Sequence, residues 1–343
     1  MIWFAVIFAI VLSIIFPKQM TAIAVFRFWR GSLLLFFGVP LSLWAQDGTT
    51  PDGFTYKTYS SGLTIRGYQG AGGAVTVPST IAGLPVIHIG DYAFHQKTNI
   101  TSLTIPSSVT TIGRSAFAGC TSLTSFAIPS GVTSIDQGAF YGCTGLTNII
   151  VPSAVISIGG YAFATCSKLA AVTFEAPSRL NNIGEYAFFG CSVLASITIP
   201  SGVTSIGKHA FSSCVGLTSL SFTAPSSLSI IGDSAFESCI NLTNLTIPSR
   251  VASIGVGAFA YCASLAADII IPAQVTSIGD SAFYKCIKIT SLSFASPSGL
   301  ISIGYFAFSG CTGLAGKLTI PSSVSSIGTA AFAECTGLTS ITF

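Results

Sequence analysis

Charge is the property that this sequence most lacks. Only 7% of its 343 residues are charged, whereas about a quarter of an ordinary soluble domain is. Three basic residues, Lys18, Arg27 and Arg30, lie in the first 45 residues, which contain no acidic side chain. The rest of the chain carries eleven basic and eleven acidic residues and is therefore neutral. This balance excludes the basic surface with which a protein binds nucleic acid or an anionic membrane.

The signatures of catalysis are also missing. The chain has only three histidines, His88, His95 and His209, and none of the patterns G-x-S-x-G, C-x-x-C or G-x-G-x-x-G. Its carboxylates show no recurring pair at a spacing that suits acid and base chemistry. We therefore expect no enzyme activity, no catalytic residues, no metal site and no cofactor.

The N-terminal segment carries an export signal. Residues 20–45 place Arg27 and Arg30 before an apolar run, and Ala45 is a small residue at a plausible cleavage point. This is the layout of a secretory signal peptide. No cysteine lies near Ala45 to accept a lipid. We expect a secreted or cell-surface protein.

A second apolar run, residues 2–16, precedes this signal and is short for crossing a bilayer. Two alternatives remain for residues 1–19. Either Met20 is the true start and they lie upstream of it, or the two apolar runs form a membrane hairpin with the basic loop inside. Both alternatives export everything that follows, and the second adds an N-terminal membrane anchor.

Cysteine is absent from the first 119 residues and then recurs at a regular interval. Ten copies of 23 to 26 residues fill residues 105–343, and the first is IPSSVTTIGRSAFAGCTSLTSFA. Phe lies three residues before each cysteine, Pro opens each copy, and Gly follows an Ile in nine copies, with Asp136 in the tenth. Each copy holds one cysteine, and these are Cys120, Cys143, Cys166, Cys191, Cys214, Cys239, Cys262, Cys286, Cys311 and Cys335.

An eleventh, degenerate copy occupies residues 77–104. It keeps Pro78, Gly90 and Phe94 but has Lys97 where the cysteine is expected. A charge at an otherwise apolar position is typical of the exposed outer side of a terminal repeat. Residues 77–104 are therefore predicted to be a capping repeat, preceded by a strand-rich lead-in over residues 46–76.

The end of each copy has the alternation of a short strand. In LTSFAIP, we expect Leu123, Phe126 and Ile128 to face inward, with the residues between them facing outward. Proline then ends the strand because it has no amide hydrogen to donate. No copy buries enough apolar surface to fold alone, so the copies must stack. The fold predicted is a β-rich, right-handed, leucine-rich-repeat-like solenoid with parallel concave strands.

The other half of each copy is predicted to turn. Val109 and Ile112 point inward, and Gly113 is expected to adopt a left-handed conformation, for which Asp136 is among the better substitutes. The segment SAFAGC is too short for a lasting helix and is predicted to form one helical or 3₁₀ turn that inserts Phe117 and Cys120.

The pattern C-x-x-L-x-x-[LIVF]-x-[IFV]-P, followed by SIG and AF, resembles the BspA-type (Treponema-type) leucine-rich repeat of bacterial surface proteins. The resemblance covers residues 75–343. It implies an extracellular interaction surface, with adhesion to proteins in the better-known relatives, and it implies no catalytic residue. The chain stops at Phe343 in mid-repeat, so we expect either a fragment or self-association through an uncapped C-terminal repeat.

A lone cysteine allows four interpretations: a catalytic thiol, half of a disulfide, a metal ligand or part of the core. Ten cysteines in phase favour the last, a ladder of buried thiols. Neighbouring copies would bring the α-carbons within bridging distance, but parallel side chains suit disulfide geometry poorly. We expect most of the thiols to be unreactive in the native protein.

Function is predicted to lie where the copies differ, on the outward side chains of the strands. These give a flat, uncharged surface of hydroxyl groups, which Asp268 and Lys317 interrupt near one end. The expected partner is an extracellular protein or glycan, and the alternative is a structural, self-associating envelope spacer. The candidate binding residues are Thr124, Ser125, Asn148, Thr218, Ser219, Thr243, Asn244, Thr290, Ser291 and Lys317.

Overall fold

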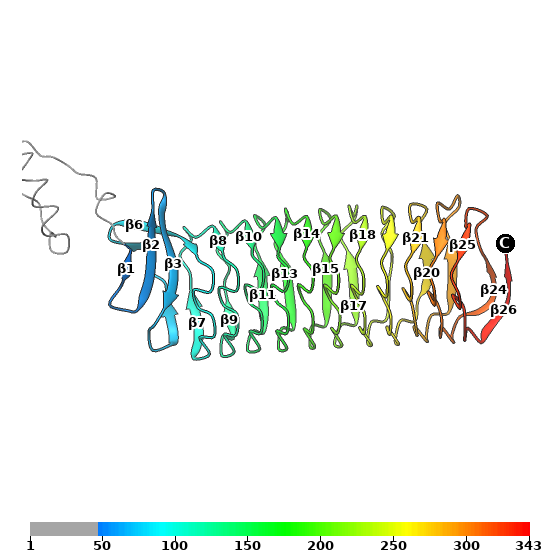
Figure 1. Ribbon diagram of the computed structural model, residues 1–343, viewed down its shortest axis with the longest axis horizontal. Helices are drawn as coiled ribbons and strands as arrows, with labels where there is room; N and C mark the ends of the chain where they lie inside the picture. The colour runs from blue at the N-terminus through cyan, green and yellow to red at the C-terminus, as the bar shows by residue number, and fades with distance from the viewer. Residues whose placement is uncertain (1–46) are drawn as a thin grey trace, which may run out of the picture. The chain divides into compact units, whose positions relative to one another are not determined.

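The computed structural model describes residues 47–343, which form a stack of similar coils, each made by one repeat (Figure 1). The predictions for residues 1–19 and 20–45 lie outside the described residues. All the regular elements between residues 47 and 343 are β-strands. The predicted solenoid is therefore confirmed, with parallel pairing between successive coils.

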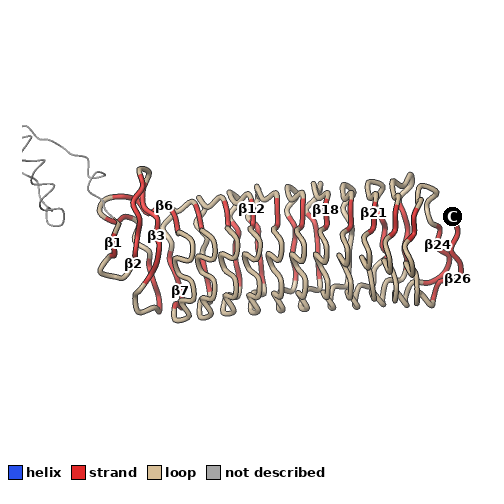
Figure 2. Tube along the Cα trace, viewed as in Figure 1, coloured by secondary structure: helices blue, strands red, loops and turns tan. Residues whose placement is uncertain are grey.

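One long sheet runs through the whole stack (Figure 2). In most coils it contains only the two residues of the Ser-Ile pair, so that Ser134 lies beside Ser157 and Ile135 beside Ile158. The isoleucines face inward as expected, but no strand was expected here, because two residues are too few to show alternation. The strands are β1 (Gly48–Thr49), β2 (Phe54–Tyr59), β3 (Gly62–Tyr68), β6 (Leu84–Ile89), β8 (Thr111–Ile112), β10 (Ser134–Ile135), β12 (Ser157–Ile158), β14 (Asn182–Ile183), β16 (Ser205–Ile206), β18 (Ile230–Ile231), β19 (Ser253–Ile254), β21 (Ser277–Ile278), β23 (Ser302–Ile303) and β25 (Ser326–Ile327), with β5 (Thr80–Ile81) paired to β6.

The predicted strands form a second row, divided into several short sheets. The expected alternation is present: Leu123, Phe126 and Ile128 are buried, and the residues between them are exposed. Residues 243–247 keep this burial pattern without regular strand pairing. The strands of this row are β4 (Gly73–Thr76), β7 (Ile100–Thr104), β9 (Ser125–Phe126), β11 (Asn148–Val151), β13 (Ala171–Phe174), β15 (Ser196–Ile199), β17 (Ser219–Phe222), β20 (Asp268–Ile271), β22 (Ser291–Phe294), β24 (Ala315–Thr319) and β26 (Gly337–Thr342).

The Ala-Phe segment is not the single helical or 3₁₀ turn that was expected. It is a run of tight turns in which amides alternate between two acceptors. The amide of Cys120 donates to Phe117 within its coil, whereas the amide of Phe117 donates to Ala139 of the next coil. Two residues per coil are left-handed, such as Ser115 (φ 49°) and Gly119 (φ 74°). This alternation satisfies the backbone and ties neighbouring coils together.

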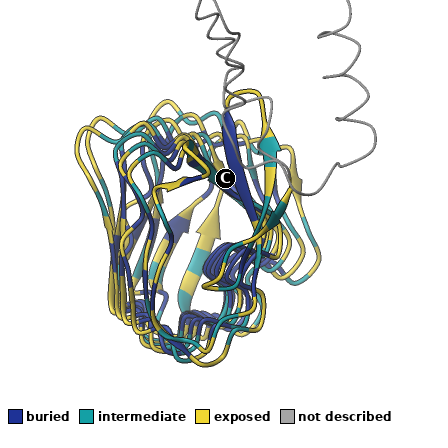
Figure 3. Cartoon of the chain, turned by 90° about the vertical axis from the view of Figure 1, so that its left-hand side faces the viewer, coloured by how far each residue is buried: buried dark blue, intermediate teal, exposed yellow. Residues whose placement is uncertain are grey.

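The core is a column of phenyl rings, one from each coil. Eleven rings from Phe94 to Phe332 stack with centroids 5.1 to 5.4 Å apart and planes within 22° of parallel. Leu, Ile, Val and Cys side chains fill the space around them, so the inside of each coil is buried and the outside exposed (Figure 3).

The degenerate copy over residues 77–104 is not the exposed end of the stack. Phe54 and Tyr68, from β2 and β3, cover the Phe94 ring with centroids 6.4 and 5.7 Å away. Strand β3 also pairs with β6 and so continues the long sheet. The antiparallel β2–β3 hairpin is therefore the cap, and Phe94 is fully buried beneath it.

The repeated glycine is needed for a close approach, not for a left-handed turn as expected. Gly232 has no positive φ, but a Cβ there would lie 2.8 Å from the carbonyl oxygen of Ile206 in the preceding coil. The same clash, under 3.0 Å, arises at all nine glycines of this position. At Asp136 the bond from the amide to the preceding coil lengthens to 3.2 Å, from 2.8 to 2.9 Å at the glycines. Asp136 is accommodated by this local separation, and its φ is not positive either.

Candidate binding surface

The outward side chains of the second row of strands form one surface, which we call the strand face. It has three rows of residues that run from coil to coil. The first row is Thr124, Thr147, Ala170, Ala195, Thr218, Thr243, Ala266, Thr290, Ala315 and Thr339. The second row is Ser125, Asn148, Ala171, Ser196, Ser219, Asn244, Asp268, Ser291, Lys317 and Ser340. The third row is Ala127, Ile150, Thr173, Thr198, Ser221, Thr246, Ile270, Ser293, Thr319 and Thr342.

All ten candidate residues from the sequence lie in the first two rows, on the same face. The third row also faces outward, as the alternation predicted at Ala127, but none of its members was among the ten candidate binding residues. This omission matters because the third row contains the most exposed isoleucines of the face, Ile150 (52% exposed) and Ile270 (59%).

The rows differ in how free their polar groups are. Threonine hydroxyls of the first row donate to carbonyl oxygens of the preceding coil, as from Thr147 to Thr124 at 3.2 Å and from Thr218 to Ala195 at 3.0 Å. In the third row, Thr198 and Ser221 share one hydrogen bond of 2.8 Å. Since a hydroxyl that is already bonded gives less to a partner, the second and third rows offer most of the available hydrogen-bonding groups.

Asp268 is the only acidic residue in the three rows. Its Oδ1 accepts hydrogen bonds from the hydroxyls of Ser291 at 2.6 Å and Thr290 at 3.1 Å. These two bonds favour the carboxylate and hold the pKa of Asp268 below its usual value. The side chain therefore stays negative and fixed in position on an otherwise neutral surface.

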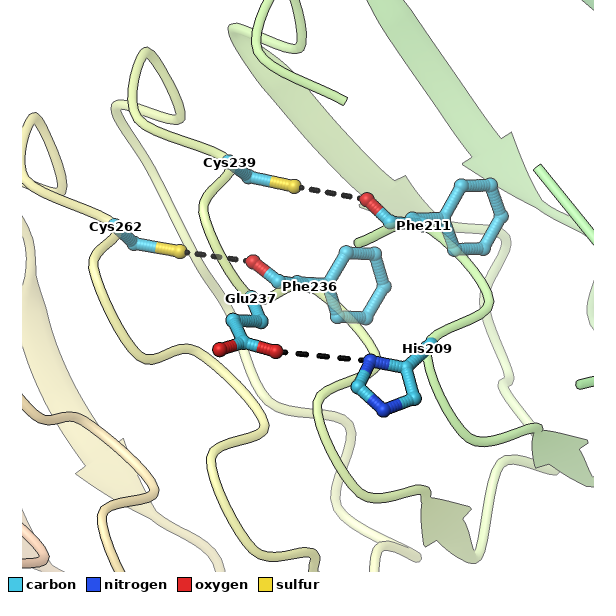
Figure 4. Close-up of polar contacts among 6 residues, drawn as sticks. All are labelled: His209, Phe211, Phe236, Glu237, Cys239 and Cys262. Atoms are coloured by element: carbon cyan, nitrogen blue, oxygen red, sulfur yellow. Dashed lines mark hydrogen bonds and ion pairs between the residues drawn. The ribbon is translucent and has the colours of Figure 1, made fainter. Parts of the chain in front are cut away.

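The ten cysteines form a row inside the stack. All are buried and none is in a disulfide. Each thiol donates to the carbonyl oxygen of the phenylalanine one coil earlier, at 3.0 to 3.3 Å. Figure 4 shows two of these bonds, from Cys239 to Phe211 and from Cys262 to Phe236.

Burial makes these thiols weak acids. It raises the pKa of Cys120 from its usual value near 9 to about 11, and the pKa of Cys166 and of Cys214 to about 12. Only the thiolate is a nucleophile. The arrangement therefore supplies packing and hydrogen bonds rather than chemistry.

We predict that thiol reagents label the native protein at pH 8 at least about a hundredfold more slowly than the urea-denatured chain, since two pKa units remove that share of thiolate. Cys335, which is 8% exposed, should react first. Fast labelling of all ten without denaturant would contradict the ladder.

The same pKa shifts act on stability. Between the pKa of the unfolded thiol, near 9, and the folded values of about 11 to 12, the folded chain keeps protons that the unfolded chain has lost. The free energy of unfolding should therefore be unaffected below pH 9 and fall as the pH rises toward 12, which urea titrations at several pH values would measure.

An aromatic cluster occupies left-handed positions on three successive coils. The rings of Tyr161, Tyr186 and His209 stack with centroids 4.7 and 4.6 Å apart. The Nδ1 atom of His209 lies 3.6 Å from Glu237 Oε2 (Figure 4). Because the rings cover each other's faces, they present mainly edges to solvent, so this cluster suits packing between coils better than stacking on a sugar.

A shallow cavity of about 410 Å³ lies along the long sheet near its C-terminal end. Its lining includes Ser302, Gly304, Asp280 and Tyr305. The amide of Tyr305 donates to Asp280 Oδ1 at 2.8 Å.

Residues 47–343 contain no cluster of three or more His, Cys, Asp or Glu side chains arranged to hold a metal ion. The same residues include no helix that is long and apolar enough to cross a membrane.

Comparison with known proteins identifies the family. The profile of the BspA type leucine rich repeat region matches residues 87–218, 171–290 and 266–343. The chain belongs to the BspA-type leucine-rich repeat family. The resemblance seen in the repeat is thereby confirmed over three quarters of the sequence. Among curated proteins, none matches the chain.

Solved structures of leucine-rich repeat proteins share the fold. A leucine-rich repeat protein of Treponema pallidum is 33% identical, with 57% of this chain and 90% of that one covered and a TM-score of 0.51. A leucine-rich cell surface protein of Faecalibacterium prausnitzii is 28% identical over 87% and 94% of the two chains, with a TM-score of 0.54. A leucine-rich repeat protein of Bacteroides ovatus, 24% identical over 85% and 93%, has a TM-score of 0.52 and shows the fold alone.

Proposed function

We propose that this BspA-type protein is an exported, non-catalytic binding module whose strand face recognises an extracellular protein or glycan. The observation that carries the proposal is the strand face itself, with three rows of exposed side chains that the core does not require. The centre of a protein interface usually contains few charged residues, because a charge there must be desolvated when the partner binds. The cell-surface relative from Faecalibacterium prausnitzii supports an external location.

Export rests on the signal in residues 20–45, and the chain meets a membrane only through its N-terminal segment. The neutral surface argues against nucleic acid as a partner. A structural, self-associating envelope spacer remains the alternative, and its proposed contact is the last repeat, where Ile341 is 38% and Phe343 83% exposed.

The binding proposal is tested with the exported protein on matrix proteins, host-cell surfaces and glycan arrays. Once a ligand is found, Thr173→Arg should raise its Kd at least about tenfold, because it places an unpaired charge on the strand face. Asn181→Arg is the matched control, an exposed residue of the next coil beside the long sheet. Failure to bind any surface, or equal effects of the two variants, would refute the proposal.

A further inference from the structure

The strand face carries two charges, and they lie symmetrically about β22. Asp268 begins β20, Lys317 lies in β24, and β22 is the strand between these two (Figure 1). Neither charge forms an ion pair within residues 47–343. The other members of the three rows are all uncharged.

Both charged residues follow a one-residue insertion in their coil. Coils around Ala267 and Gly316 each have one more residue than usual between the first and second rows. The amide of Ala266 donates to Thr243, as usual for the first row, and Asp268 then pairs with Ser291. In β24 the register with β26 shifts between Gly316 (φ 82°) and Lys317, whose partners are Leu338 and Ser340. A bulge can re-aim a neighbouring side chain in this way.

The irregularities leave the two charges at the same level along the strands. Lys317 pairs with Ser340, which occupies the second row as Ser291 does. The amide of Ala315 donates to Thr290 at 3.4 Å, which aligns the first row of β24 with that of β22. Asp268, Ser291 and Lys317 are therefore consecutive members of one row, negative, neutral and positive.

Such a row is complementary to itself under a two-fold rotation. If the axis lies in the plane of the face and runs along β22, the second copy reverses the order of its coils but keeps its strand direction. Asp268 then faces Lys317 of the second copy, and Lys317 faces its Asp268. An axis along the stack would instead place like charges together. Sheets that pack face to face keep their strands aligned within about 30°, which both axes allow, so the positions of the charges decide between them.

We infer that the strand face around β22 pairs with a second copy of this chain. In this dimer the two stacks of coils run in opposite directions, and two reciprocal Asp268–Lys317 contacts set the register. Facing sheets pack about 10 Å apart, a gap that a lysine and an aspartate side chain span together. The inference does not rest on the proposed ligand function.

The neighbourhood of the two charges fits this occupant. Ile270, the most exposed isoleucine of the face, comes opposite Thr319 of the second copy and loses water there. Asn244 comes opposite Ser340 of the second copy, so two hydrogen-bonding side chains face each other. The one unfavourable charge is Lys288, which lies in the turn before β22. It approaches Lys288 of the second copy at the solvent-exposed rim of the interface.

The dimer is expected to be weak. Five strand segments, residues 243–247 with β20, β22, β24 and β26, overlap about the axis, a patch of roughly 24 Å by 17 Å. Counted over both copies this is about 800 Å², below a standard-size interface and in the range of weak, transient contacts. Dimerisation should therefore be detected by sedimentation equilibrium up to about 500 µM protein, and high salt should weaken it.

Charge exchange tests the register. Asp268→Lys and Lys317→Asp should each weaken dimerisation at least about tenfold, because each brings like charges together twice. The double exchange should restore it to within about threefold. An equimolar mixture of the two single variants should form the heterodimer although neither forms a homodimer. Lys288→Gln is the control variant and should leave dimerisation equal or slightly stronger.

Cross-linking tests the axis. Ser291→Cys places a thiol next to the same thiol of the second copy, so a short bismaleimide should join the two chains. The native cysteines are buried and should not compete for the reagent. Ser219→Cys is the matched control, in the same row and in the identical sequence SLSF of β17, and should not cross-link. A chain that stays monomeric to 500 µM, or a dimer indifferent to the charge exchange, would overturn the inference.

Discussion

Phe236→Ala is expected to lower the free energy of unfolding by about 3–5 kcal/mol, the usual cost of removing a fully buried phenyl ring. Phe236 is 0% exposed and stacks on Phe211 and Phe259, both with parallel planes within 2°. The substitution would leave a cavity in place of this ring and interrupt the column of phenyl rings between Phe211 and Phe259. In a repeat protein each coil contacts only its neighbours, so the loss concentrates at that junction. Urea unfolding followed by circular dichroism measures it.

Phe332→Ala is the matched control for this experiment. Its ring is only partly buried and stacks on one described neighbour, Phe308, at 5.4 Å. About half of the loss is expected, because half of the ring contacts are present. Equal losses at residues 236 and 332 would show that the column of rings does not hold the coils together.

Gly232→Ala is expected to lower the free energy of unfolding by about 2–3 kcal/mol. Where space allows, a change from glycine to alanine usually stabilises a protein instead. The added methyl would meet backbone atoms on Gly207 and Ile206 at 2.8 Å, and backbone cannot rotate away as a side chain can. The preceding coil must therefore separate locally. A fall in the midpoint of urea unfolding, with faster hydrogen exchange of the Gly232 amide, would measure this.

Asp136→Gly provides the reciprocal test. The Asp136 amide bond to Ile112 is already stretched to 3.2 Å, so glycine should let it shorten and change stability by less than about 1 kcal/mol. Gly232→Asp should cost more than Gly232→Ala. If aspartate were tolerated equally at both positions, close approach would not be the reason for the glycine.

The repeat determines much of this fold from sequence, because each position recurs ten times under the same physical constraint. Alternation assigns Phe126 and Ile128 to the inside, and Leu123, three residues before Phe126, is assigned by its recurrence in the repeat. The long sheet could not, since its strands of two residues exist only through pairing with neighbouring coils. The glycine was correctly noticed but wrongly explained, because a steric demand from the preceding coil is not visible in a single repeat.

The binding surface was predictable to a similar extent. Alternation identifies the side chains that leave the core, and composition shows that they are neutral hydroxyls. The alignment of Asp268 with Ser291 and Lys317 needed the structure, since each insertion shifts the count along the sequence by one.

The uniform spacing of the phenyl column also has a genetic consequence. Since each ring meets an equivalent ring at 5.1 to 5.4 Å, one coil is nearly interchangeable with the next. Unequal recombination between the repeats of such a gene would add or remove whole coils, and each new junction would again stack one ring on an equivalent ring. The number of repeats, and with it the reach of the protein, can thus change between generations without a new core having to evolve.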